Sequence, residues 1–381
     1  MIDLRTCTPK TASAPSCIWN KDTANAVPAV CSRYIDETQD LMITVNTLND
    51  NPHTSEFTYR INFRTMYTDK EHPLAQGSRL VNGRTSRPED TQRRVAVTVL
   101  GDRLAFYSNV LQSRDEEDYH LYRWSLHVLN WHMGDQPDDK FMLGESYDLV
   151  EIRFLTEEKL LALTTRAEIE LYNVEDLSKA PQLQARFMLP VIPQSLLLRY
   201  PSVFHSTPSC ARLTAPGDRW IWTTNPADRV ICVMTVRHPL AIFVIHARLF
   251  FMDIPLTWFD TTSKDGRAIP WSTWGPQSSR CFPQALDIPF LSAVGYRFGV
   301  GGSRVMRVVE HRMHMTDFNP SAVARGIGKD VTTYLPYVEV VNSDRNFAGL
   351  LEDIILDEEK VLIFIQNYDD CEVMDVEIID L

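Results

Sequence analysis

Few residues in this sequence have the types and spacing that catalysis or ligand binding requires. His311 and His314, in "EHRMHM", stand three positions apart and could share a metal ion only on a helix. The apolar pattern around them is typical of a strand, on which residues three apart face opposite sides, so packing or solvent contact is the favoured interpretation. In "ARGIGKD", Asp330 stands where a phosphate-binding loop requires Ser or Thr after its lysine.

Other motifs of catalysis and cofactor binding are missing from the sequence. The glycine-rich stretch "GYRFGVGGS" lacks the spacing of a dinucleotide-binding motif, and it predicts a bulge or a turn. There is no G-x-S-x-G, no H-E-x-x-H and no EF-hand loop. We therefore expect no catalytic residue, no bound cofactor and no metal site.

The segment "AIPWSTWGPQSSRCFP" (268–283) has the residue types that anchor protein interfaces. Trp271 and Trp274 lie between prolines and a glycine, with Arg280 close behind, and Trp and Arg are enriched in such anchors. We name these three residues as candidate partner-binding residues of a predicted loop, in which the two tryptophans lie outside a convincing strand. The alternative is that the two rings pin the loop onto the fold, because an exposed pair of Trp side chains is costly.

The elements that must position such a loop are predicted by apolar periodicity. In "FLTEEKLLALTTRAEIELYNVED", two apolar runs, 160–163 and 169–174, are joined by a polar link of turn-forming length. Apolar residues occur on both faces of the second run, which indicates a strand that is covered on both sides. The segment "EEDYHLYRWSLHVLNWH" also alternates, and we favour a strand there over an amphipathic helix.

This hairpin pattern recurs along the chain. The units are spaced by about 55 to 80 residues, longer than regular propeller repeats, so inserted loops are expected. Six turns are predicted, near Asp40, Asp102, Glu158, Arg219 to Asp228, Gly301 and Asp357. The range 76–94 is predicted to be a long polar loop.

We predict an all-β fold, a β-propeller of six to seven irregular blades with few short helices, because stacked blades leave strands apolar on both faces. Whether the ring closes is left open. A pair of β-sandwiches is the alternative and would show more one-sided alternation. Residues 1–33 are predicted to be a loose N-terminal extension, and residues 34–381 to form the propeller.

Charge and cysteine usage limit the partners and the compartment. With 38 basic and 50 acidic residues the net charge is −12, which disfavours nucleic acid and anionic membranes as partners. From Asp344 to Leu381, 12 acidic residues stand against two basic ones. A solvated acidic face is the favoured interpretation, and a docking surface for a basic partner is the alternative. Seven scattered cysteines and no signal-peptide pattern predict a cytoplasmic or nuclear protein.

The order of several motifs resembles the region after the F-box in basidiomycete-type fungal F-box proteins. The matching fragments run over about residues 34 to 381: "DETQDLMITV", "HPLA", "VLGDRLAFYS", "LHVLNWHMGD", "FLTEEKLLALTTRAEIELYNVEDLS", "IPWSTWGP", "VGYRFG", "MTDFNP", "LPYVEVV" and "ILDEEKVLIF". The resemblance implies a propeller-like substrate-recognition region of a ubiquitin-ligase receptor. No F-box-like helical start precedes residue 34, so we expect that a Skp-type adaptor does not bind directly.

Three functional hypotheses follow. The favoured one is a non-catalytic protein-interaction module with an unknown protein ligand. The second is a hydrolase with an active site at the central funnel, which requires titratable groups to converge at one mouth of the axis. The third is a decayed, non-functional F-box paralogue.

Overall fold

Short runs of alternating side chains become strands throughout the structure, a computed structural model. The description covers residues 30–36, 39–48, 56–84, 93–114, 120–133, 141–146, 149–190, 196–199, 225–235, 241–263, 266–283, 298–309, 312–319, 337–342, 350–356, 360–366 and 374–380. The first strand begins at Val30, inside the range 1–33 that was expected to be an extension; residues 1–29 lie outside the description.

The first half of the described chain forms three antiparallel sheets of consecutive strands, here called blades 1, 2 and 3. Blade 1 consists of β1 (Val30–Asp36), β2 (Leu41–Leu48), β3 (Glu56–Thr65) and β4 (Arg79–Arg84). Blade 2 consists of β5 (Arg93–Leu100), β6 (Arg103–Arg114), β7 (His120–Asn130) and β8 (Phe141–Ser146). Blade 3 consists of β9 (Leu149–Thr156), β10 (Lys159–Thr164), β11 (Glu168–Asn173) and β12 (Gln182–Met188), with β16 (Ala268–Ile269) added at its edge.

The second half forms blades 4, 5 and 6. Blade 4 consists of β13 (Leu196–Arg199), β14 (Val230–Thr235), β15 (Ala241–His246) and β17 (Ser279–Pro283). Blade 5 consists of β18 (Phe298–Gly301), β19 (Arg304–Val309), β20 (Arg312–Asp317) and β21 (Val338–Asn342). Blade 6 has three described strands, β22 (Leu350–Leu356), β23 (Lys360–Gln366) and β24 (Met374–Asp380).

Helical structure in the described residues is confined to four short elements, three of which lie between β15 and β17. They are the 3₁₀ turns η2 (Pro226–Asp228), η3 (Ala247–Phe250) and η4 (Leu256–Trp258), and the helix α1 (Trp271–Ser278). We call residues 247–278 the blade 4 insertion; its residues 264–265 lie outside the description.

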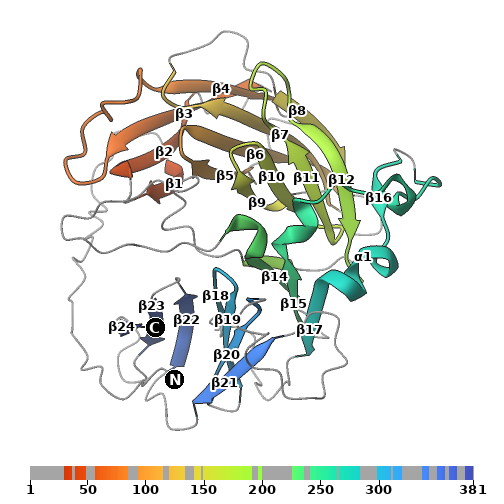
Figure 1. The fold of residues 1–381 in the computed structure, drawn as a ribbon. Helices are drawn as coiled ribbons and strands as arrows, with labels where there is room; N and C mark the ends of the chain where they lie inside the picture. The colour runs from red at the N-terminus through yellow and green to blue at the C-terminus, as the bar shows by residue number, and fades with distance from the viewer. Residues whose placement is uncertain are drawn as a thin grey trace.

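The six blades follow one another in chain order around a common centre (Figure 1). Within each blade the first strand lies nearest the centre, and first strands of consecutive blades contact each other, as β1 contacts β5 and β5 contacts β9. This arrangement is a β-propeller, and it confirms the predicted all-β fold over the pair of sandwiches.

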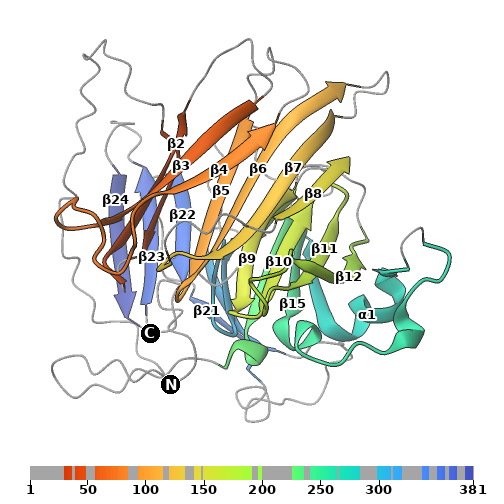
Figure 2. The same ribbon diagram turned by 90° about the horizontal axis from the view of Figure 1, so that it is seen from above.

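Apolar side chains fill the joints between consecutive blades. Each of five clusters of buried described residues joins one pair of neighbours; between blades 1 and 2, for example, Ile43 and Tyr59 pack with Leu104 and Phe106. No cluster of described residues joins blade 6 to blade 1, although both views place these blades on the same side of the molecule (Figures 1 and 2).

Positions of the predicted turns match the structure closely. Those near Asp40, Asp102, Glu158 and Gly301 fall at the link between the first two strands of a blade, and Asp40, Gly101 and Gly302 adopt the positive φ that tight turns require. Asp357 and residues 219–224 lie outside the description. The segment at 120–130 is the strand β7, as favoured. The prediction of a long loop over 76–94 was wrong, because β4 occupies residues 79–84 and β5 begins at Arg93.

Candidate functional site

The blade 4 insertion ties blades 3 and 4 together. It leaves β15, pairs in parallel with β12 through β16, and returns as β17 to the edge of blade 4. In that pairing Ala268 aligns with Arg186 and Ile269 with Phe187. The insertion projects at the outer side of the ring in both views (Figures 1 and 2).

Trp274 is a core residue at the base of this insertion. Its side chain is 0% exposed and packs edge-on against Phe187 of β12, with ring centroids 5.6 Å apart. Phe187 in turn contacts Phe250 of η3 at 5.2 Å. A partner cannot touch Trp274 while the insertion is folded, so this candidate residue supports the surface from beneath instead of forming it.

Trp271 lies above Trp274 at the start of α1 and is partly buried. Its ring is 4.7 Å from that of Trp274 and 5.7 Å from that of Phe243, both in edge-on geometry. Gly275 allows the ring to fold back on the helix, since a Cβ at this position would lie 2.2 Å from a Trp271 ring atom. The predicted loop is therefore a short helix with one Trp inside and one at the surface.

Arg280 lies on β17, so the prediction of a loop over 268–283 was wrong at this end of the range. Its guanidinium carbon is 5.4 Å from the ring centroid of Tyr337 and 6.0 Å from that of Phe282. Arg307 of β19 approaches the Phe282 ring more closely, at 4.2 Å. The guanidinium groups of Arg280 and Arg307 thus both lie near the Phe282 ring, where blades 4 and 5 meet.

The Arg307 side chain is held in place by Glu339 of β21. Arg307 donates to Glu339 Oε1 at 2.8 Å, and the ring nitrogen Nδ1 of His314 lies 3.0 Å from the same oxygen. Burial alone would raise the pKa of Glu339, but hydrogen bonds from Arg307 and His314 outweigh it and lower the pKa. His314 thus contacts a carboxylate; His311, with which a metal site was considered, lies outside the described residues.

The blade 4 insertion exposes two large apolar side chains among polar ones. Leu256 at the start of η4 is 86% exposed, and Met252 is 40% exposed. Several aromatic and aliphatic residues beneath them are partly buried against the cluster between blades 3 and 4: Phe251, Ile254, Trp258, Phe259 and Trp271. Sequence reasoning missed Leu256, although its position in "DIPLTWFD", after a proline and before two aromatic residues, marks an apolar turn.

Lys159 of β10 fixes the beginning of the insertion from blade 3. Its ammonium donates to the Phe250 carbonyl at 2.8 Å and lies 5.5 Å from the Phe251 ring centroid. Burial lowers the pKa of this ammonium, while Asp253 and Glu158 oppose the shift. The apolar outer surface therefore rests on a base held by strand pairing, aromatic packing and one charged hydrogen bond.

Groups with shifted pKa values are dispersed among the blades. Burial lowers the pKa of His127 in blade 2 to about 4 and raises that of Cys232 in blade 4. In blade 3, burial and the neighbouring Glu170 raise the pKa of Tyr172, whose hydroxyl donates to Glu170 Oε2 at 2.5 Å. Burial is the leading cause in each case, and these groups do not converge at one mouth of the axis.

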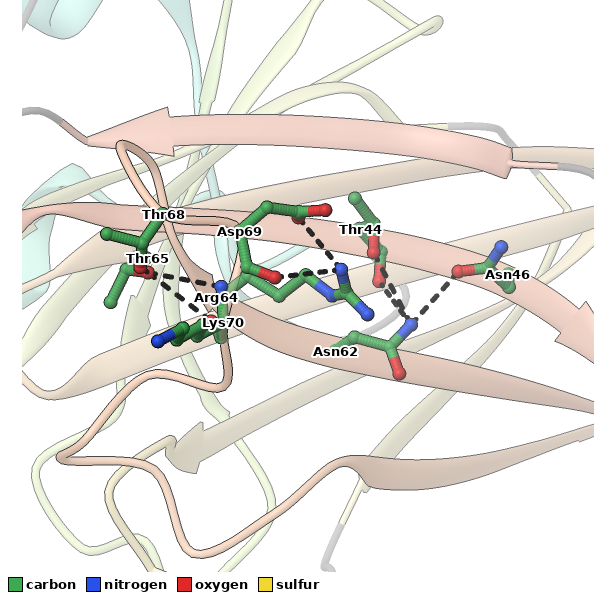
Figure 3. Close-up of polar contacts among 8 residues, drawn as sticks. All are labelled: Thr44, Asn46, Asn62, Arg64, Thr65, Thr68, Asp69 and Lys70. Atoms are coloured by element: carbon green, nitrogen blue, oxygen red, sulfur yellow. Dashed lines mark hydrogen bonds and ion pairs between the residues drawn. The ribbon is translucent and has the colours of Figure 1, made fainter.

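The open face of blade 1 is polar and joined by hydrogen bonds (Figure 3). Asn62 of β3 donates to Asn46 Oδ1 at 3.0 Å and to Thr44 Oγ1 at 3.3 Å across the β2–β3 pair. Further along, Arg64 forms an ion pair with Asp69 at 2.8 Å. This face turns away from blade 2, whose apolar cluster takes the alternate residues Ile43, Ile61 and Phe63.

Within the described residues, no three His, Cys, Asp or Glu side chains come together as metal ligands. None of the described helices is long and apolar enough to cross a membrane.

Comparisons with known proteins identify no family. No family model and no curated protein matches the chain. Among solved structures, it is similar to Saccharomyces cerevisiae Sqt1, with a TM-score of 0.36, 11% identity, and coverage of 89% of this chain and 80% of that one. It is also similar to the β-propeller domain of Myceliophteria thermophila Cps50 (Swd1), with a TM-score of 0.32, 10% identity, and coverage of 92% and 97%. At these values the likenesses add nothing to what the blades themselves show.

Proposed function

We propose that this chain is a non-catalytic protein-interaction module, and that its contact surface is the outer side of the blade 4 insertion together with β17. The observation that carries the proposal is an exposed apolar tip on a rigid base: Leu256 is 86% exposed while Trp274 beneath is fully buried. Apolar and aromatic side chains gathered at a surface are typical of a binding site, and Met252, Leu256 and Trp271 come from this one insertion. Arg280, beside the rings of Phe282 and Tyr337, provides a cationic edge to it.

A capture experiment tests this surface. The chain is immobilised and exposed to a fungal lysate, and captured proteins are compared between the wild type, Leu256→Glu and Tyr67→Glu. Tyr67, in the turn after β3, is 75% exposed and provides a matched control on blade 1. We expect Leu256→Glu to lose the specific ligand and Tyr67→Glu to keep it, with unchanged thermal unfolding in both.

Two results would count against the proposal. One is capture of no specific protein by the wild type under any condition. The other is equal capture by wild type and Leu256→Glu, which would move the contact surface elsewhere on the propeller. The triple variant Met252→Glu, Leu256→Glu and Trp271→Glu makes the second result decisive. If it melts like the wild type and still captures the ligand, the insertion is not the contact surface.

The resemblance to fungal F-box proteins supports a finer proposal, that the ligand is a substrate for ubiquitin ligation in the cytoplasm or nucleus. On this proposal the chain holds the substrate, and a Skp-type adaptor does not bind it directly. Co-purification with a purified Skp-type adaptor tests this finer proposal separately from the proposed interaction surface. Direct adaptor binding would contradict this finer proposal, whereas equal capture of the ligand by the wild type and Leu256→Glu would contradict the interaction surface itself.

A further inference from the structure

Blade 6 differs from the others in its number of described strands, so that its third strand, β24, is also its described rim strand. Each of blades 1 to 5 has at least four described strands, whereas blade 6 has three. Among the described strands, β24 pairs only with β23, over Lys360↔Asp380 to Gln366↔Met374. Its other edge therefore presents the backbone donors and acceptors of alternate residues of this seven-residue strand, with which a further strand could pair.

The face of blade 6 that turns away from blade 5 is apolar beside this edge. Val361, Ile363 and Ile379 pack into the joint with blade 5. The alternate positions on β24, Val376 and Ile378, are 41% and 44% exposed. These two residues lie opposite Phe364 and Leu362 of β23, so an apolar stripe runs up to the free edge.

Charge decides which strand could pair there. From Asp344 to Leu381 the chain has 12 acidic and two basic residues, and "MDVEIID" itself has three acidic and none basic. A second copy of β24 would place like charges side by side, which disfavours self-association. Residues 1–29 of this chain have a net charge of only +1 and are interrupted by Pro9, Pro15 and Pro28.

We propose that the free edge of β24 binds an extended, basic segment of a partner protein, which adds to blade 6 as its fourth strand. Backbone hydrogen bonds to β24 supply affinity, and side chains supply selection. Positions opposite Val376 and Ile378 accept apolar residues, and positions opposite Glu377 accept Lys or Arg. The recognised segment thus alternates basic and apolar residues. This surface is separate from the blade 4 insertion.

Two strand-forming peptides test the edge on the full chain. One peptide alternates Lys and Val, and the other alternates Glu and Val. Each is titrated into the full chain while the hydrogen exchange of the β24 amides is followed, with the β23 amides as the reference. We expect only the Lys–Val peptide to bind, to slow exchange of the β24 amides, and to bind more weakly as salt increases. The Leu256→Glu variant should bind it as the wild type does.

Charge-matched variants separate pairing at β24 from general attraction to an acidic chain. Ile378→Lys and Ile378→Glu remove the same apolar contact, but only the Lys repels a basic strand, so we expect the Kd to rise about fivefold more for Ile378→Lys than for Ile378→Glu. Leu80→Lys is the control, because Leu80 on β4 is a rim residue of blade 1 with 46% exposure. Its Kd should equal that of the wild type.

Several outcomes would overturn the proposal. Equal binding of both peptides, or protection outside blade 6, would remove the edge as the site. Amides of β24 that exchange as slowly as those of β23 in the free chain would mean that the chain already covers its own edge. Concentration-dependent protection with dimer formation in sedimentation would identify a second copy as the occupant.

Discussion

The joint between blades 3 and 4 and the joint between blades 5 and 6 are built very differently. The former has the largest of the five apolar clusters of described residues, and the blade 4 insertion crosses it to pair with β12. The latter has the smallest cluster, and blade 6 contributes three described strands, which pack into such a cluster on one face. In an array of blades that contact mainly their neighbours, such differences make local stability uneven.

This unevenness teaches that the two proposed surfaces suit different modes of recognition. Leu256 and Trp271 lie on a base fixed by neighbouring blades, which favours a preformed contact with little ordering on binding. The edge of β24 lies on the blade with the least packing, where a partner strand would supply pairing that the described chain does not. Stability measurements on each joint can therefore test the comparison directly.

The largest expected effect is at the joint between blades 3 and 4. Trp274→Ala removes a fully buried ring that packs on Phe187, and the cavity should lower the free energy of unfolding by about 3–5 kcal/mol. Urea unfolding followed by fluorescence and circular dichroism measures this change. Leu256→Ala, in the same insertion but exposed, is the control and should change it by less than about 0.5 kcal/mol. Equal effects would mean that the insertion is not anchored through Trp274.

Acid should weaken the joint between blades 1 and 2 next. The pKa of His127 is lowered from 6.5 to about 4 by burial, and neither ring nitrogen has a hydrogen-bond partner. Below pH 6.5 the unfolded chain binds a proton that the folded chain excludes, so stability is lost as the pH falls from 6.5 to 4, by about 3 kcal/mol.

Replacement of His127 isolates this contribution. His127→Leu should remove that part of the slope of unfolding free energy against pH between 4 and 6.5, and should leave stability at pH 7 unchanged or higher, because two unsatisfied nitrogens are removed. Unfolding at a series of pH values provides the measurement. A slope identical to that of the wild type would show that His127 does not carry the acid sensitivity.

A smaller effect is expected where blade 5 meets blade 6. At Gly299 an added Cβ would lie 2.8 Å from the backbone oxygen of Ile354 and 3.1 Å from the Cβ of Leu356. Gly299→Ala should therefore separate the two blades slightly, at a cost of about 1–3 kcal/mol. Hydrogen exchange should accelerate in β22–β24 while β10 and β11 keep their rates; uniform acceleration would show that blade 6 unfolds only with the whole ring.

The smallest effect is expected on the polar face of blade 1. The Arg64–Asp69 pair is solvent-exposed, with 42% and 67% of the two side chains accessible, so Arg64→Ala should change the unfolding free energy by less than about 1 kcal/mol. A thermal melt with and without added salt measures it. A larger loss of unfolding free energy would mean that another part of the chain packs on this face of blade 1.

The sequence predicts the strands of this propeller well where side chains alternate and glycine or aspartate marks the turn. The three turns at Asp40, Gly101 and Gly302 combine both signals. It fails for β4, whose "RLVNGR" contains asparagine, glycine and arginine and gains its conformation from pairing with β3. It also fails for β16, since a two-residue parallel pair between blades is a tertiary contact with no local pattern.

The candidate site was predictable in position but not in role. The residue types around Trp271, Trp274 and Arg280 mark a special segment, but both tryptophans have the same local preferences. Which one is buried depends on α1, a helix of eight residues with Pro276 inside, and on the rings of blade 3 that it meets. Only the fold supplies those neighbours.

The parallel pairing of β16 with β12 has a mechanical consequence. If the chain were pulled from its two ends, blade 6 would unfold first, because its described strands pair only with one another and pack into an apolar cluster on one face. Blades 3 and 4 would resist the force longest, because the pairing of β16 with β12 joins blade 4 to blade 3, so the two must unfold together. Under tension the molecule would thus unfold from its carboxyl end towards blades 3 and 4.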